Sequence, residues 1–315
     1  MTREEVMERL AQSNRTFHEE DLSNLKLSGI EFSEPNFKGA NLEKTDFSGA
    51  DLDGASFENS IINGTDFSDT YLVKADFEVL KIRRANFSHA VLRYASMCNI
   101  NLSGTMMSGA MLGGISMNDA ILNRSILCYA DFTESFLANS RFKSTISANA
   151  VFTKAEMEGA DFSNAVLIGA VFTEARLVNS KFRGADLVNA DFSNANLEKA
   201  DFRSARLRIG AEKYFEEAYE YPRAKFPGAV LTGARLSHLN LSTIDFSGAD
   251  LTGVDLSSAD LSGADLTGVD LRGSDLRKAV FTGANISSAD FTGANTQGAI
   301  FREVTGRNSA IGLDW

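Results

Sequence analysis

Histidine, cysteine and long apolar runs are scarce in this chain of 315 residues, which contains three histidines and two cysteines. No stretch stays apolar for more than a few residues, so none is long enough to span a membrane. The opening MTREEVMERL lacks the basic start and apolar stretch of a signal peptide. We therefore expect a cytoplasmic protein that does not enter a membrane.

What the chain has instead is an apolar residue at every fifth position. From Phe17 to Leu207 each fifth residue is Leu, Phe, Ile or Met, and Ser147 is the single exception. A second series runs from Phe226 to Phe301, with Thr296 as its exception. A period of five fits neither an amphipathic helix nor a strand. The chain is therefore a repeat protein in which every five residues form one side of a coil.

Small residues mark the corners and the interior of this coil. Glycine or asparagine often follows an apolar centre by two positions, as at Gly49, Gly54 and Asn59, and both residue types tolerate the positive φ of tight turns. Alanine often precedes a centre by two positions, as at Ala50 and Ala160, which suits a narrow interior shared with a larger neighbour.

These repeats resemble a known family. The strings GADLTGVDLSSADLSGADLTGVDL (248–271) and NADFSNANLEKADF (189–202) are similar to the pentapeptide-repeat proteins, whose motif is A(D/N)LXX. The resemblance covers most of the chain. It implies an all-β fold, a right-handed quadrilateral β-helix with four sides and 20 residues in each coil, so that residues twenty apart are vertical neighbours.

The repeat register divides the chain into five segments. We expect an N-terminal capping helix (1–16), a first β-helix segment (17–207), a protruding insert with helical propensity (208–225), a second β-helix segment (226–301) and a C-terminal tail or plug (302–315). At the N-terminus, Thr2 and Glu5 form a capping-box pattern and Val6, Met7 and Leu10 give an apolar face. Residues 2–13 are therefore expected to form a helix over the first coil.

The C-terminal tail has lost the motif, but Ile311, Leu313 and Trp315 alternate. Alternation suits a final strand or a plug, whereas in the family this end is often where two rods join. Both readings remain open.

The two cysteines are expected to be reduced. Cys98 and Cys128 each follow a centre, so both should point outward, and their separation of 30 residues puts them on opposite sides of the coil. They therefore cannot pair within the chain, and a reduced compartment is the simpler interpretation.

The formal charge of −11 suggests a DNA mimic, because some members of the family protect type II topoisomerases by imitating DNA. Spread over a stack roughly 65 Å long, however, this is only about one charge per 6 Å, against about one per 1.7 Å in duplex DNA. The aspartates from Asp245 to Asp275 occupy every side in turn and are expected to be solvated turn residues. The alternative is a cation between stacked pairs such as Asp250 and Asp270.

One side of the coil is unusual because it carries no charge over several coils. Apolar residues replace the usual Asp or Asn at Met106, Ile126, Ile146 and Val166, and the neighbouring outward residues include Cys128, Tyr129 and Ile168. Contiguous exposed apolar patches usually have a use, so we interpret this side as a docking stripe for a partner or a second copy. The alternatives are motif drift, or a slip that turns Ile146 inward and Ser147 outward. An inward Ser147 would leave a hole costing about 2–5 kcal/mol.

The gap between Leu207 and Phe226 is the second irregularity, since it holds fourteen residues more than one side needs. Its segment AEKYFEEAYEY (211–221) favours a short helix that Pro222 stops. Four aromatic residues make it a candidate contact, because interface hot spots use such side chains: Tyr214, Phe215, Tyr219 and Tyr221. Alternatively, these aromatic residues pack back onto the coil.

Catalysis has little support in the sequence. His18, His89 and His238 occupy outward or linking positions and belong to no common catalytic motif, and a flat coil offers no obvious pocket. We therefore expect no enzymatic activity, no cofactor and no metal.

The leading hypothesis is a non-enzymatic interaction scaffold for a protein partner, with a homodimer as a further possibility and no direct binding of nucleic acid. Its rivals are a DNA-mimicking protector of type II topoisomerase, similar to quinolone-resistance proteins, and a secreted bacterial effector.

Overall fold

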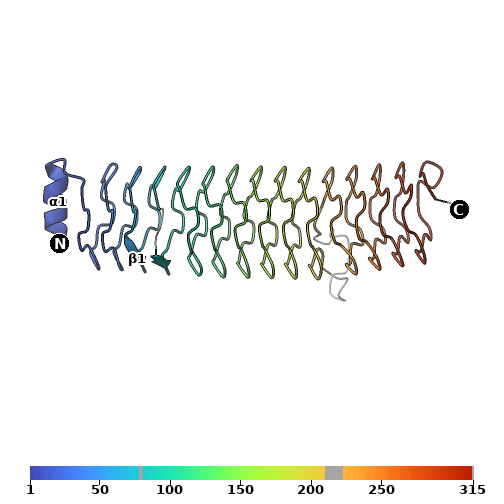
Figure 1. The fold of residues 1–315 in the computed structure, drawn as a ribbon, viewed down its shortest axis with the longest axis horizontal. Coiled ribbons are helices and arrows are strands. Elements are labelled where there is room, and N and C mark those ends of the chain that lie inside the picture. The colour runs from blue at the N-terminus through green and yellow to red at the C-terminus, as the bar shows by residue number, and fades with distance from the viewer. Residues whose placement is uncertain (78–80, 210–222, 314–315) are drawn as a thin grey trace, which may run out of the picture. The chain divides into compact units, whose positions relative to one another are not determined.

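The computed structural model describes residues 1–77, 81–209 and 223–313. The chain forms two compact units, Met1–Glu156 and Met157–Trp315, called here the first and second units. Each unit is a stack of narrow coils (Figure 1). The regular elements are helix α1 (Arg3–Ala11) and the short parallel strands β1 (Ile61–Asn63) and β2 (Lys81–Arg83). Most of the remaining pairing consists of single parallel β-bridges.

The bridges set the register of the coils. They join residues twenty apart, as in Asn36 with Ser56 in the first unit and Asp250 with Asp270 in the second. They recur every five residues, so each coil has four bridged positions. The five-residue period of the sequence is thus the spacing of the bridges, and residues twenty apart are vertical neighbours within each unit.

One repeat, residues 46–50, shows why the motif suits this backbone. All five amides donate a hydrogen bond: Asp46 N to Leu25 O (2.9 Å), Phe47 N to Asp66 O (2.8 Å), Ser48 N to Asp46 Oδ1 (3.0 Å), Gly49 N to Ser68 O (2.9 Å) and Ala50 N to Phe47 O (2.9 Å). Four of these acceptors are backbone carbonyls, and the fifth is the motif aspartate. The aspartate therefore closes its own turn while the other groups hold the coil together.

The core consists of the apolar centres and the small residues that precede them. Phe47, Phe67 and Phe87 are fully buried and stack in successive coils, with ring centroids 5.6 and 5.0 Å apart. Ser147 is also fully buried, and its hydroxyl lies 3.0 Å from Thr145 Oγ1, whereas Ile146 is 46% exposed. The slip that would turn Ile146 inward is therefore wrong.

The corner position two residues after each centre is left-handed. Gly49 (φ +66°) and Asn59 (φ +58°) adopt this conformation, as the sequence predicts, but so does Tyr129 (φ +60°). Glycine is needed for a different reason at Gly109, where an added Cβ would lie 2.5 Å from His89 Nδ1 of the preceding coil. Glycine thus makes room there for a side chain that folds along the corner.

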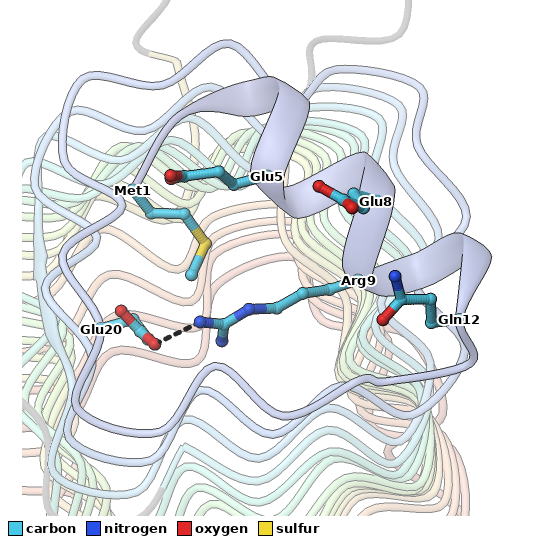
Figure 2. Close-up of a pocket in the computed structure, with 6 residues that line it drawn as sticks. All are labelled: Met1, Glu5, Glu8, Arg9, Gln12 and Glu20. Atoms are coloured by element: carbon cyan, nitrogen blue, oxygen red, sulfur yellow. Dashed lines mark hydrogen bonds and ion pairs between the residues drawn. The ribbon is translucent and has the colours of Figure 1, made fainter.

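Helix α1 lies against the first coil. Its capping box is formed as expected, with Thr2 Oγ1 accepting from Glu5 N and the Glu5 carboxylate accepting from Thr2 N. The helix is shorter than expected, however, and of the expected apolar face Val6 is fully buried while Met7 is 45% exposed. Arg9 reaches back to Glu20, with Nη2 2.7 Å from Oε1 (Figure 2).

The insert leaves the coil at a corner that stays closed. Ala224 N donates to Leu207 O at 2.7 Å, which is the bond that closes an ordinary corner, as between Ala190 N and Leu187 O. Next to it, Arg208 and Arg223 form an antiparallel bridge. The expected helix and its aromatic residues lie outside the described residues.

The coil continues into the segment interpreted as a tail or plug. Thr305 bridges Asn285, twenty residues away, but Ile311 bridges Asp290, so one extra residue is accommodated between the two bridges. Trp315 lies outside the described residues. Nowhere in the described part of the chain is a helix both long enough and apolar enough to cross a membrane.

Candidate docking surface

Three apolar side chains form a vertical row on one face of the first unit. Met106 bridges Ile126 and Ile126 bridges Ile146, so the three residues lie one above the other in successive coils. Their exposed fractions are 42%, 37% and 46%. This row, Met106, Ile126 and Ile146, is called the apolar ladder below. It brings together three of the residues that the sequence suggested for docking.

The apolar ladder lacks a bond that the repeat makes elsewhere on the same face. One coil before Met106, Asn86 Oδ1 accepts from Ser88 N at 3.1 Å. Met and Ile side chains cannot accept such a bond, so the corresponding turns in the ladder lack this side-chain acceptor. The three amides concerned are those of Ser108, Cys128 and Ala148. Each forgone bond is worth about 0.5–1.5 kcal/mol, so the ladder gives up turn stabilisation that Asn86 provides one coil earlier.

Two further candidate residues flank the ladder. Tyr129 is 68% exposed at the turn after Ile126, where an aromatic ring is available for contact. Cys128 is a free thiol that is only partly exposed, and its Sγ lies 3.7 Å from the carbonyl oxygen of Ile146. Cys98 is free as well. Both thiols are therefore less exposed than a purely outward orientation implies.

The remaining candidate residues are not part of this ladder. Val166 and Ile168 belong to the second unit, where Ile168 is 38% exposed and Val166 is half-buried and bridges Asp186. The four aromatic residues of the insert, Tyr214, Phe215, Tyr219 and Tyr221, lie outside the described residues.

A second row of apolar residues was missed by the sequence interpretation. Tyr71 bridges Val91 and Val91 bridges Met111, and Tyr71 and Met111 are 54% and 44% exposed. Met111 follows Met106 by one repeat, so the two rows occupy neighbouring faces of the first unit. The signal was present, since these residues also replace the motif Asp or Asn at intervals of twenty. They escaped notice because charged residues share their face.

Family comparisons identify the repeat. The family described as Pentapeptide repeats matches residues 148–184, 170–208, 229–268 and 259–298, and the family described as Pentapeptide repeat region matches residues 30–107. The chain belongs to the pentapeptide repeat family. No curated protein matches the chain.

Several solved structures of pentapeptide repeat proteins are similar to the chain. HetL, involved in heterocyst differentiation regulation in the cyanobacterium Nostoc sp. strain PCC 7120, is 23% identical over 96% of this chain and 94% of its own, with a TM-score of 0.17. Rfr23 from the cyanobacterium Cyanothece 51142 is 24% identical over 40% and 90%, with a TM-score of 0.29. QnrB1, a plasmid-mediated fluoroquinolone resistance protein, is 20% identical over 67% and 92%, with a TM-score of 0.27.

The aspartates of the second unit behave as motif residues of the pentapeptide repeat. Asp245, Asp250 and Asp255 each accept a bond from the amide two residues later, at 2.9–3.1 Å. The side-chain hydrogen bond from Arg272 lowers the pKa of Asp270 below the usual 3.8 of an aspartate. Within the described ranges, no cluster of three or more His, Cys, Asp or Glu side chains is placed to hold a metal ion.

Proposed function

We propose that this pentapeptide repeat protein is a non-enzymatic, cytoplasmic scaffold that binds a protein partner through the apolar ladder. The observation that carries this proposal is the stacking of Met106, Ile126 and Ile146 in slots where the repeat elsewhere uses Asp or Asn to close its turns. Apolar side chains at these positions remove the side-chain hydrogen bond of the turn and are exposed to water. Binding to another molecule explains their presence best. In this proposal the scaffold is a right-handed, four-sided β-helix that α1 caps.

The chemistry of the ladder suggests what the partner offers. Three aliphatic or thioether side chains call for an apolar surface, and Tyr129 beside them has the size and polarity of an interface anchor. The amides of Ser108, Cys128 and Ala148 lack the motif side-chain acceptor, and we infer that they can donate to carbonyl oxygens of a partner. A partner segment that presents apolar side chains together with its backbone carbonyls fits both features.

The test exchanges the ladder for motif residues. A variant carrying Met106→Asn, Ile126→Asn and Ile146→Asn restores the acceptor that Asn86 provides in the preceding coil. We expect its unfolding midpoint to stay the same or rise, because three turn bonds are regained. Partners recovered by affinity capture from source-cell lysate, and then titrated individually against the purified variant, should bind at least tenfold more weakly.

The matched control is Val230→Asn, which removes a 37% exposed apolar residue from the same slot in the second unit. This variant should retain all binding. If the ladder variant is folded and keeps both its partners and its oligomeric state, the docking proposal is wrong. Loss of self-association alone would identify the partner as a second copy of the chain.

The insert is proposed as a second contact, because four aromatic side chains are concentrated in it. Capture with a chain that lacks residues 210–223 separates the two contributions. Partners shared with the intact chain bind the coil, and partners that are lost bind the insert.

Protection of a type II topoisomerase is the rival function. Several of the second unit's aspartates are paired with arginines, among them Asp270 with Arg272 and Asp275 with Arg277, which reduces the exposed negative charge. We therefore expect no rescue in a gyrase supercoiling assay with a quinolone at saturating protein. Rescue would favour the rival.

A further inference from the structure

A face of the second unit carries two arginines above an almost fully buried carboxylate. Arg183 and Arg203 lie twenty residues apart, and both bind Asp201, which is only 7% exposed. Arg183 Nε is 2.5 Å from Asp201 Oδ2, while Arg203 donates from Nε to Oδ1 at 2.9 Å and from Nη2 to Oδ2 at 2.8 Å. One carboxylate thus orients two guanidinium groups.

The two arginines border a shallow hollow of about 490 Å³, whose other lining residues are Ser163, Asn164, Gly184 and Ser204. Gly184 lets the Asn164 side chain lie against the backbone at the edge of the hollow, because a Cβ at position 184 would lie 2.6 Å from Asn164 Oδ1. Ser163 and Asn164 add polar atoms along one edge. The hollow therefore has polar walls and two fixed cations.

Charge on this face is positive toward solvent, although the chain as a whole carries −11. Lys181 and Arg235 bridge Asp201 from either side, and both are exposed. The two carboxylates in the rungs of the hollow, Asp161 and Asp201, are 8% and 7% exposed, and the next carboxylate of the row, Asp255, lies beyond Arg235. The cations therefore face the solvent while the carboxylates lie beneath them, an arrangement that attracts anions.

A count of donors indicates the class of anion. A guanidinium has five N–H groups, and the bonds to Asp201 occupy one on Arg183 and two on Arg203, which leaves about seven. A phosphoryl group offers three terminal oxygens to such donors, one more than a carboxylate, and paired arginines match its geometry. We propose that this hollow binds a phosphoryl oxyanion, either free phosphate or a phosphate monoester on a partner.

The experiment is calorimetric titration of the full chain with inorganic phosphate and with a phosphoserine peptide, at constant ionic strength. We expect binding of at least one probe, and no binding of the same peptide with unmodified serine. Arg183→Gln should weaken binding at least tenfold. This variant keeps Asp201 paired with Arg203, so the buried carboxylate is not left alone and the fold is retained.

The matched control is Arg277→Gln. Arg277 also pairs with an aspartate two residues before it, Asp275, but it does not line the hollow. This variant should bind the probes as the unchanged chain does. Binding of neither probe, equal losses in the two variants, or tighter binding of the peptide with glutamate in place of phosphoserine would each overturn the proposal. Binding of phosphate alone would assign the site to the free anion, and binding of the peptide would assign it to a monoester.

Discussion

The residue before each apolar centre either accepts the hydrogen bond that closes the turn or places an apolar side chain on the surface. Asp46 in this position accepts the amide of Ser48 and closes its turn, whereas Ile126 leaves the corresponding amide without a side-chain acceptor. Both repeats have a fully buried centre, Phe47 or Leu127, and the same pattern of backbone bonds. Exchange at this position therefore alters the surface of the coil while its interior stays unchanged.

Ser147 is the residue whose replacement should stabilise the first unit. Leu127 fills the same interior slot one coil earlier and is fully buried, so Ser147→Leu should raise the free energy of unfolding by about 1–2 kcal/mol. The Thr145 hydroxyl keeps its bond to Phe142 O, so no buried hydroxyl is left unpaired. Urea denaturation measures the change, with Ala148→Leu on the partly exposed turn as a control near zero. A lower midpoint for Ser147→Leu would mean that the slot has no spare volume.

Acid should weaken the pairing between Asp275 and Arg277. The side-chain hydrogen bond from Arg277 lowers the pKa of Asp275, so its stabilising contribution is complete above the ordinary pKa of 3.8 and is lost as the pH falls through the lower value in the folded state. Arg277→Gln should return the pKa toward 3.8. Carboxyl-carbon NMR titration of Asp275 measures this, and Arg302→Gln should leave the titration unchanged.

The orientation of the Ser147 side chain could not be predicted from the sequence, although the five-residue period could be read from it directly. Both arrangements keep every other centre in place, and they differ in which of Ser147 and Ile146 is buried and in the interior contact with Thr145. Likewise, the sequence showed that Arg183 and Arg203 are twenty residues apart, but it could not show that both reach Asp201. The direction in which a long side chain turns depends on packing, which the period does not specify.

At the scale of elements, α1 illustrates what local sequence can specify. The capping box of Thr2 and Glu5 was predictable because it depends on residues three apart. The exposure of Met7 was not, because it depends on how the helix lies on the coil. Contacts between elements therefore decide which of the apolar residues become core.

Loss of the N-cap should loosen α1 without affecting distant coils. Thr2→Ala removes the hydroxyl that accepts from Glu5 N, so helix stability should fall by about 1 kcal/mol. Amide hydrogen exchange should accelerate within Arg3–Ala11, and Met7→Ala should change it little. Unchanged amide exchange in Thr2→Ala would show that contacts with the first coil, such as those of Val6, determine the stability of the helix.

Removal of the insert tests how the corner at its root is built. Deleting residues 210–223 places Ile209 directly before Ala224, which restores an ordinary repeat and retains the bond from Ala224 N to Leu207 O. We expect the thermal midpoint to change little. Deleting only 210–222 leaves one extra residue, which shifts the register, and should lower the midpoint clearly. Equal midpoints would contradict this view of the corner.

At the scale of the whole molecule, interactions between neighbouring coils hold the structure together. Its backbone bonds and ring stacks join residues about twenty apart, so each coil depends mainly on the next. The sequence period was sufficient to establish this architecture. It did not reveal the division into two units at Glu156, because the period is unbroken there.

Damage to the core should therefore remain local. Phe67 stacks on Phe47 and Phe87, so Phe67→Leu should accelerate amide exchange in those coils. Exchange around Phe246, in the second unit, should be unaffected, whereas Phe246→Leu should give the converse pattern. Faster exchange throughout both units after either substitution would indicate a single cooperative structure instead.

The bond between Ala224 and Leu207 has a practical consequence. Because this hydrogen bond closes the corner at the base of the insert, we expect the coil to fold whatever the length and composition of the insert. An epitope, an affinity tag or a foreign binding loop grafted between Ile209 and Ala224 should be displayed while the protein keeps its architecture.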